Sequence, residues 1–343
     1  MAYTNIDDPS AHFQTALHSS TNAATITNDG NSDLKPDLIW SKARGAAYNH
    51  ALYDSTRGVT KFLKSNSTNA ETTASSGFDL TSFNTDGFST GNNQFNTICG
   101  GTTYVAWQWK ANGGTTASNS DGTITSTVQA NTTAGFSIIT YTGTGSAGTI
   151  GHGLGVKPDI IIFKRRNGTN NWDFQFKGEA RLTLNLTDAQ ATNVLCTFTS
   201  TTTDLGSTAT AEKNANGGTY IAYAFAEKQG YSKFGSYVGN GNANGPFIYT
   251  GFKPAFVMVK RSDGTSDWTI LDNKREGYNL INKRLVANSS AAEATYNVLD
   301  FVSNGFKFRD GDGIWNGSGS TYIFMAFAEN PFTTSSGIPT TAR

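Results

Sequence analysis

The sequence predicts an all-β protein of three tandem antiparallel β-sandwich repeats with a jelly-roll or lectin-like topology. Three observations predict this class: a pattern that occurs three times, short strand-like apolar segments within each occurrence, and Gly- or Asn-rich turns between them. Each repeat has roughly a hundred residues, whereas a propeller blade has about 40 to 50, so a sandwich is favoured over a propeller.

The repeat is defined by anchors at matching spacings. A Lys-Pro pair begins at Lys35, Lys157 and Lys253, and seven residues later each copy has a second lysine, at Lys42, Lys164 and Lys260. A Thr-Tyr pair near the end of each copy places Tyr104, Tyr220 and Tyr322. These anchors divide the chain into repeat 1 (1–110), a linker with an extra strand (111–133), repeat 2 (134–228), repeat 3 (229–330) and an extended tail (331–343).

Each repeat is expected to open and close with a strand. The opening strands are led by aromatic residues, at 13–17, 136–141 and 234–238, and the extra linker strand is expected at 123–128. The closing strands alternate large and small side chains, as in Ile221, Ala222, Tyr223 and Ala224. This alternation predicts that the large face fills a core and the small face allows close approach of another layer. Short apolar runs, 160–163 and 256–259, are expected to be central strands.

Helical content is expected to be small. The candidate helical turns are 68–71, 187–191 and 289–293, where a Ser or Thr precedes Ala and Glu or Gln, as at helix N-termini.

The copies differ at positions that carry charge or aromatic rings. Asp54 with Arg57 and Asp272 with Arg275 share the same offsets, and the favoured interpretation is a structural ion pair. The second copy departs from this pattern, with Phe176 and a nearby Arg181. Trp172 and Trp268 share an offset at which the first copy has His50.

The composition excludes several classes of protein. The 343 residues carry 26 basic and 26 acidic side chains, a net charge of zero, which argues against nucleic acid as a partner. The aromatic content of 12% is too high for a disordered chain. No apolar run is long enough for membrane insertion, and the start has neither the basic nor the apolar region of a signal peptide. Cys99 and Cys196 are expected to be free, buried thiols.

Several motifs resemble a repeat module of virion structural proteins from tailed phages of marine bacteria. The residues that carry the resemblance are 1–10, 31–37, 83–88, 104–110 and 151–155. Proteins of this kind are labelled tail fibre, head fibre or lectin-like structural proteins. The resemblance covers nearly the whole chain and implies a place on the virion surface, with no binding residues to carry over.

Two kinds of binding site have candidate residues. Trp172, Trp268 and Trp315 are candidates for stacking on sugar rings of a host-surface glycan, although a repeated tryptophan is more often part of a core. Asp310 and Asp312 are candidate calcium ligands, but the calcium-loop pattern is incomplete and an ordinary hairpin turn is favoured. No cofactor other than calcium is indicated.

An enzyme is disfavoured. A glycan depolymerase needs two carboxylates about 5 to 9.5 Å apart, and pairs such as Asp54 with Asp86 or Asp272 with Asp300 can be named in any β-rich chain. The sequence therefore favours a non-enzymatic virion protein, either a capsid decoration or head fibre or a tail fibre or spike component. Its expected role is assembly or host attachment, and its expected partners are other virion proteins and further copies of itself in a homo-trimer. The alternative is a carbohydrate-binding lectin module.

Overall fold

The structure is a computed structural model that describes residues 4–193, 195–206 and 210–340. Within these residues it contains twenty-six strands and one short 3₁₀ helix, η1 (Pro9–Ala11), and all the ladders between named strands are antiparallel. The all-β sandwich class is therefore confirmed. The three expected helical turns are wrong, because residues 68–71, 187–191 and 289–293 are irregular loops.

The first unit has a large sheet and a small one. The large sheet has the order β1-β9-β3-β4-β5-β6 and the small sheet the order β2-β8-β7. Their bounds are β1 (Phe13–His18), β2 (Ala24–Ile26), β3 (Leu38–Ala43), β4 (Ala51–Asp54), β5 (Lys61–Leu63), β6 (Thr72–Thr73), β7 (Leu80–Phe83), β8 (Phe88–Thr90) and β9 (Tyr104–Trp109).

The second unit includes the linker. The large sheet has the order β10-β11-β12-β18-β14-β15-β16, and β13 pairs with β17 in a small sheet. The bounds are β10 (Ala117–Asn119), β11 (Ser126–Asn131), β12 (Phe136–Thr142), β13 (Thr149–Gly151), β14 (Ile160–Arg165), β15 (Asp173–Phe176), β16 (Ala180–Thr183), β17 (Thr202–Asp204) and β18 (Thr219–Phe225). The linker thus contributes two strands, where one was expected, and both extend this sheet.

The third unit is one eight-stranded sheet with the order β19-β26-β21-β22-β23-β24-β25-β20. The bounds are β19 (Ser232–Val238), β20 (Phe247–Tyr249), β21 (Phe252–Arg261), β22 (Thr269–Asp272), β23 (Ile281–Val286), β24 (Ala294–Val302), β25 (Gly305–Phe308) and β26 (Thr321–Pro331). This sheet folds over on itself, because residues of β24 and β25 share a hydrophobic cluster with residues of β21 and β26.

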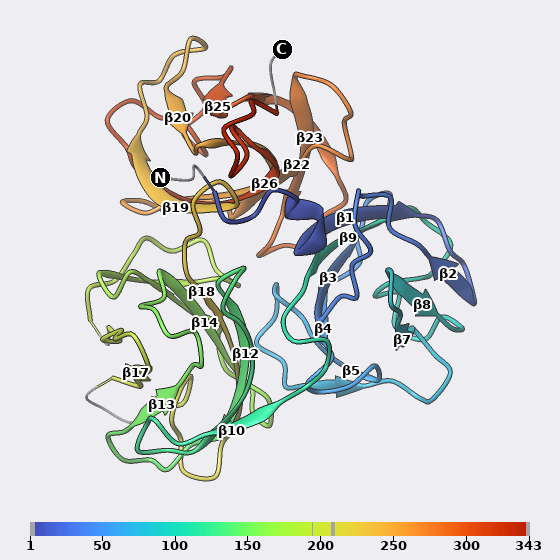
Figure 1. The fold of residues 1–343 in the computed structure, drawn as a ribbon, viewed down its shortest axis with the longest axis vertical. Helices are drawn as coiled ribbons and strands as arrows, with labels where there is room; N and C mark the ends of the chain where they lie inside the picture. The colour runs from blue at the N-terminus through green and yellow to red at the C-terminus, as the bar shows by residue number, and fades with distance from the viewer. Residues whose placement is uncertain (1–3, 194, 207–209, 341–343) are drawn as a thin grey trace.

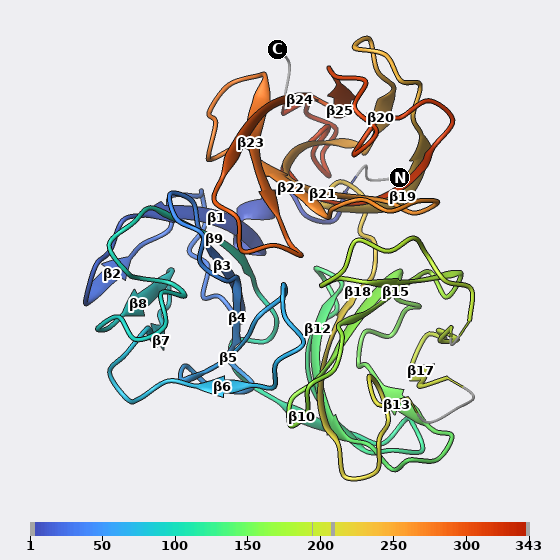
Figure 2. The same cartoon turned by 180° about the vertical axis from the view of Figure 1, so that it is seen from behind.

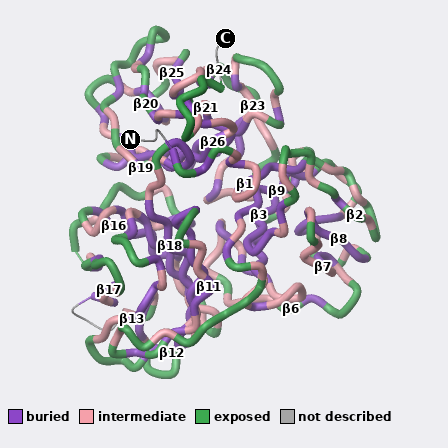
Figure 3. Tube along the Cα trace, in the orientation of Figure 1, coloured by how far each residue is buried: buried purple, intermediate pink, exposed green. Residues whose placement is uncertain are grey.

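The three units share one strand order and surround a common centre. The orders β1-β9-β3-β4-β5, β12-β18-β14-β15-β16 and β19-β26-β21-β22-β23 correspond strand by strand. Figure 1 shows three lobes arranged as a triangle, with the large sheets toward the middle and the small sheets toward the periphery, and Figure 2 shows the same arrangement from behind. Figure 3 shows that buried residues follow the strands while many outer loops are exposed.

A single hydrophobic cluster fills the space between the three large sheets. The large faces of all three closing strands belong to it: Val105, Trp107, Trp109, Ile221, Tyr223, Phe225, Ile323, Met325 and Phe327. The Trp109 ring lies 6.4 Å from that of Phe225 in the second unit and 5.6 Å from that of Phe327 in the third, centroid to centroid. The large faces therefore pack between units.

The small faces line a separate core inside each unit. Ala106 lies in the cluster of the first unit, Ala222 and Ala224 in that of the second, and Ala326 in that of the third. The two-sided burial of these strands explains the alternation: bulky residues meet other units, and alanines allow the second layer of the same unit to approach closely.

The segments near the two ends of the described chain contact each other beside the third unit. Figure 1 shows both ends at this unit. Asp7 accepts hydrogen bonds from the backbone N–H of Ser335 at 2.6 Å and from its hydroxyl at 2.5 Å. The tail was expected to be extended over 331–343. In its described part, 331–340, it turns back, since the Thr334 N–H donates to the Ile338 carbonyl, and residues 341–343 lie outside the described residues. Cys99 and Cys196 are free and buried, as expected. No helix in the described residues has the length and apolar character needed to cross a membrane.

Candidate functional site

The positions shared by His50, Trp172 and Trp268 join the units into a closed ring. Each side chain donates a ring N–H to a backbone carbonyl of another unit, at or just after the end of the equivalent strand, which is β23, β5 or β16. The bonds run from His50 Nε2 to Val286 (2.9 Å), from Trp172 Nε1 to Lys64 (2.8 Å) and from Trp268 Nε1 to Thr183 (3.1 Å). The first unit thus bonds to the third, the second to the first and the third to the second.

His50 is held as the neutral Nε2–H tautomer. Its Nδ1 accepts a 2.8 Å hydrogen bond from Trp40 Nε1, so the proton that reaches the Val286 carbonyl sits on Nε2. Burial is the main cause that lowers the pKa of His50, to about 3, and the nearby Lys42 charge adds to it. The imidazole of His50 therefore makes the same inter-unit hydrogen bond that the indole N–H groups of Trp172 and Trp268 make in the other two units.

The three loops that were expected to be helical turns, 68–71, 187–191 and 289–293, each bond to another unit. We call them inter-unit straps. The backbone N–H groups of Glu71, Gln190 and Glu293 each donate a 2.8 Å hydrogen bond to a carbonyl of the next unit, at Arg166, Ser262 and Arg44. The Glu71 carboxylate accepts two bonds from Arg166, at 2.9 and 3.0 Å, and Glu293 accepts two from Arg44, both at 2.9 Å. These contacts with another unit override the weak local preference for a helix N-terminus, which explains the error in the sequence-based expectation.

The recurring Asp–Arg pairs lie beneath two of these straps. Asp54 with Arg57 and Asp272 with Arg275 are ion pairs with fully buried side chains. A residue from another unit completes each pair: Tyr223 Oη donates to Asp54 at 2.8 Å, and Trp107 Nε1 donates to Asp272 at 2.9 Å. Burial raises the pKa of Tyr223 well above its ordinary value, so the phenol stays a donor. The expected structural ion pairs are confirmed, and each one receives a hydrogen bond from another unit.

The junction between the second and third units has apolar residues at the positions where the other two junctions have the buried ion pair and its hydrogen-bond donor. Trp107, Tyr223 and Met325 occupy equivalent positions, three residues after the repeated tyrosine, and Phe176 occupies the position of Asp54. Phe176 and Met325 both belong to the shared central cluster. Copy 2 thus lacks the aspartate and copy 3 lacks the polar donor. The correspondence between the copies places both losses at the same interface, between the second and third units. The substitution pattern is the sequence signal that pairs these positions, and sequence reasoning missed it.

In two of the three units, the second repeated lysine also bonds across a junction. Lys42 Nζ donates to the Ser290 carbonyl of the third unit at 3.1 Å, and Lys164 Nζ donates to the Thr68 carbonyl of the first unit at 2.8 Å. Lys260 Nζ contacts carbonyls of its own unit, at Arg261 and Gly264. Burial lowers the pKa of each of these lysines to about 8.

The three tryptophans proposed for sugar stacking are buried. Trp172 and Trp268 lie in the central cluster, and Trp315 lies in the core of the third unit, where the Arg284 guanidinium sits 5.6 Å from its ring. None of the three rings is available at the described surface, so the structure favours the core interpretation for all three positions.

The Asp310 and Asp312 carboxylates are engaged in turn hydrogen bonds. Asp310 Oδ1 accepts from the Asp312 N–H at 3.0 Å, and Asp312 Oδ1 accepts from the Ile314 N–H at 2.8 Å. In the described part of the chain, no group of three or more His, Cys, Asp or Glu side chains is arranged to hold a metal ion. This geometry favours the hairpin-turn interpretation.

The acid pairs considered for catalysis have structural partners. Asp54 and Asp272 are buried against arginines, Asp300 pairs with Arg309 at 2.5 Å, and Asp86 accepts from the Leu34 N–H at 3.2 Å. Each of these four carboxylates therefore has a hydrogen-bond or ion-pair partner within the fold.

A family match extends across the whole ring. Residues 8–331 match the family described as "Domain of unknown function (DUF7483)". The chain belongs to this family. No curated protein and no solved structure gives a significant match. The DUF7483 domain therefore comprises all three units together with the linker, in agreement with the core that they share.

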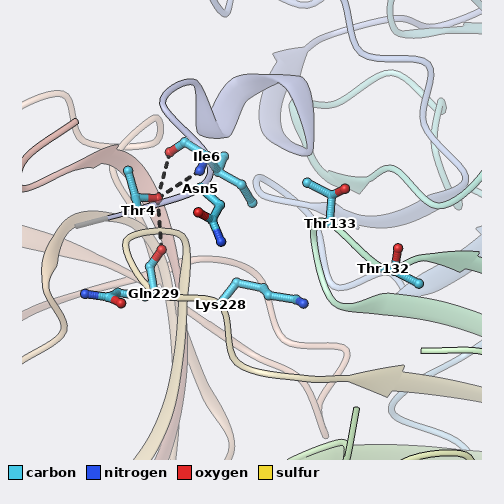
Figure 4. A pocket seen from close by; sticks show the side chains of 7 residues that line it. All are labelled: Thr4, Asn5, Ile6, Thr132, Thr133, Lys228 and Gln229. Carbon is cyan, nitrogen blue, oxygen red and sulfur yellow. Dashed lines mark hydrogen bonds between the residues drawn. The ribbon is translucent and has the colours of Figure 1, made fainter. Parts of the chain in front are cut away.

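One cavity of the DUF7483 domain lies where the N-terminal segment crosses the junction between the second and third units. It has a volume of about 260 Å³. Its lining is Thr4, Asn5, Ile6, Thr132, Thr133, Lys228 and Gln229 (Figure 4). Thr4 Oγ1 donates to the Gln229 carbonyl at 2.9 Å, which ties the N-terminal segment to the link between these units. The residues around this cavity thus connect the N-terminal segment to the link between the second and third units.

A larger cavity of the DUF7483 domain, about 440 Å³, lies between the first and third units. Its lining includes two ion pairs, Lys253 with Glu329 and Lys274 with Asp29, both at 2.8 Å. The Lys274–Asp29 pair connects the two units at the surface, so this cavity also borders an inter-unit contact.

Proposed function

We propose that this DUF7483 protein is a non-enzymatic structural protein of a phage virion, placed on the particle surface with other virion proteins. The observation that carries the proposal is the ring: the repeated Asp–Arg pairs, lysines and indoles are used to lock three units around one core. Recurring polar groups that hold three units in one rigid body suit a protein that assembles with other virion proteins. Such a body can also present its outer loops at the particle surface. The resemblance of its motifs to virion proteins of marine tailed phages supports the location.

The proposal includes a role in decoration or host-surface attachment. The net charge of zero and the hydroxyl- and amide-rich composition suit contacts with neighbouring subunits or neutral glycans, without long-range electrostatic steering. Attachment through such a surface is expected to change little between low and marine ionic strength.

Purified particles of the encoding phage test this proposal. Mass spectrometry is expected to find the chain in particles that survive density-gradient purification, and immunogold labelling is expected to decorate their surface. A chain that is abundant in infected cells and absent from purified particles would contradict it.

The expected homo-trimer is a separate part of the proposal. One chain already surrounds a threefold centre, so a trimer of chains has to use outer surfaces of this body. Mass photometry of the purified chain measures this directly: a particle of three chain masses supports the trimer, and a particle of one chain mass at micromolar concentration contradicts it.

A further inference from the structure

Each sandwich has an edge where a strand of its large sheet lies beside the next strand along the chain. These strands are β1 and β2 in the first unit, β12 and β13 in the second, and β19 and β20 in the third. In the second unit the linker strand β11 fills the gap. β11 pairs with β12 over five residue pairs, from Thr127 with Thr140 to Asn131 with Phe136. On its other side, β11 pairs with the second linker strand, β10, over three residue pairs, and Ser126 Oγ donates to the Gly151 carbonyl of β13 at 2.7 Å. This edge of the second unit is therefore closed by a strand.

The first unit closes its edge with its own loop. The segment after β2 folds back beside β1, where the side-chain amide of Gln14 accepts a 2.9 Å bond from the Gly30 N–H and donates a 2.7 Å bond to the Ser32 carbonyl. Eight residues separate Ile26, the end of β2, from Lys35, so the loop is long enough to do this.

Among the residues that the structure describes, neither device is found in the third unit. Its corresponding strands, β19 and β20, are the two outermost strands of the eight-stranded sheet. Only three residues separate the end of β20 from Lys253, and the link before β19 is short, so neither can supply a covering strand. Apolar side chains at this edge are exposed: Val238 by 59%, Phe247 by 47% and Tyr249 by 60%. Monomeric sheets normally protect such an edge.

The backbone of β19 is oriented to accept a partner. The Phe234 N–H points away from β26, since it donates to the Glu227 carboxylate at 3.3 Å. Because strand backbones alternate with a period of two, the N–H groups of Ser236 and Val238 point the same way. A cavity of about 290 Å³ opens at one end of the edge, between Ser232 and Lys233 of β19 and Tyr249 of β20.

We propose that the edge between β19 and β20 receives an extended strand from another protein chain, paired with β19 as β11 is paired with β12. The second unit indicates the chemistry of that strand: β11 has the sequence Ser-Thr-Val-Gln-Ala-Asn, uncharged, with small or β-branched residues at most positions. Backbone hydrogen bonds supply the affinity, and the exposed Val238, Phe247 and Tyr249 cover the apolar side chains of the incoming strand. This interaction does not depend on the virion assignment.

A peptide taken from the chain itself tests the edge. A fluorescent peptide with the sequence of residues 123–131 is expected to bind the full-length protein saturably, whereas a scrambled peptide of the same composition does not bind. Ser236→Pro removes an outward N–H and leaves the ladder with β26 intact, so it is expected to weaken binding at least tenfold. Val238→Lys is expected to weaken it similarly.

The matched control is Val156→Lys, which introduces the same change at an exposed valine of the second unit and is expected to leave peptide binding unchanged. Thermal unfolding of each variant shows whether it remains folded. The proposal is overturned if the parent protein shows no saturable binding up to about 1 mM peptide. It is also overturned if folded Ser236→Pro and Val238→Lys variants bind as tightly as the parent. Failure of the virion proposal appears separately, as absence of the chain from particles.

Discussion

Tyr223 of the second unit donates a 2.8 Å hydrogen bond to the carboxylate of Asp54 in the first, and both residues are buried. The same phenol oxygen accepts a 3.2 Å bond from Arg57 Nη2, so one hydroxyl completes a buried ion pair that its own unit does not contain. The relationship shows how the units depend on one another: the first unit alone would leave this pair incomplete.

Tyr223→Phe is expected to reduce the free energy of unfolding by about 1 to 3 kcal/mol, because Asp54 and Arg57 lose a buried partner while the ring volume is kept. Urea denaturation followed by tryptophan fluorescence measures the change. The matched control is Tyr278→Phe, at a side chain that is 84% exposed, which is expected to change the value by less than about 0.5 kcal/mol. Equal effects of the two substitutions would show that the phenol contributes nothing to the interface.

Arg57→Leu is expected to cost about 3 to 5 kcal/mol of stability, since it leaves the Asp54 carboxylate buried without its cation. Arg309→Leu removes the arginine of a surface pair with Asp300 and is expected to cost about 0 to 1 kcal/mol. The measurement is the shift in denaturation midpoint of the two variants. A cost for Arg57→Leu as small as that for Arg309→Leu contradicts the role assigned to the buried pair.

Acid is expected to weaken the junction that His50 makes with the third unit. The folded-state pKa of His50 is about 3, below its ordinary value of 6.5, because burial disfavours the imidazolium. Between these values the unfolded chain binds a proton that the folded chain does not. The free energy of unfolding therefore does not depend on His50 titration above pH 6.5. It falls as pH decreases from 6.5 toward 3, by up to about 1.4 kcal/mol per pH unit from this group.

His50→Gln keeps a side-chain donor and acceptor and removes the titration. The free energy of unfolding of this variant is expected to depend less steeply on pH between 6.5 and 3 than that of the parent, whatever its value at neutral pH. Parallel pH profiles for parent and variant would mean that His50 is protonated in the fold without cost.

The sequence predicts much of the fold and little of the ring. The repeat anchors and alternating strands predict the all-β class and the closing strands β9, β18 and β26, because core strands follow a local period of two. The same alternation cannot say which face meets another unit, since Trp107 and Ala106 are both buried. Straps such as the loop with Glu71 have the composition of a helix N-terminus, and only the contact with Arg166 in another unit decides against a helix.

The candidate site residues show the same limit. Trp172 and Trp268 recur for a reason that their sequence context does not reveal: each donates an N–H across a junction. The exchange of Asp54 for Phe176 and of Tyr223 for Met325 is visible in the sequence. Its meaning depends on knowing that these positions meet between consecutive units.

Calcium removal is expected to leave the protein unchanged, because the Asp310 and Asp312 carboxylates accept backbone N–H groups of their own turn. Thermal unfolding in excess chelator and in millimolar calcium is expected to give the same midpoint. Asp312→Asn, which removes a charge and keeps an acceptor oxygen, is the companion variant. A midpoint that rises with calcium in the parent and not in Asp312→Asn would establish a site at this turn.

The central claim is that the three units close around one shared core and unfold as a single body. Differential scanning calorimetry tests it most directly, by comparing the calorimetric enthalpy with the van't Hoff enthalpy of the same transition. The account predicts one transition with a ratio near one. Separate transitions, or a ratio near three, would show that the units unfold independently and would contradict it.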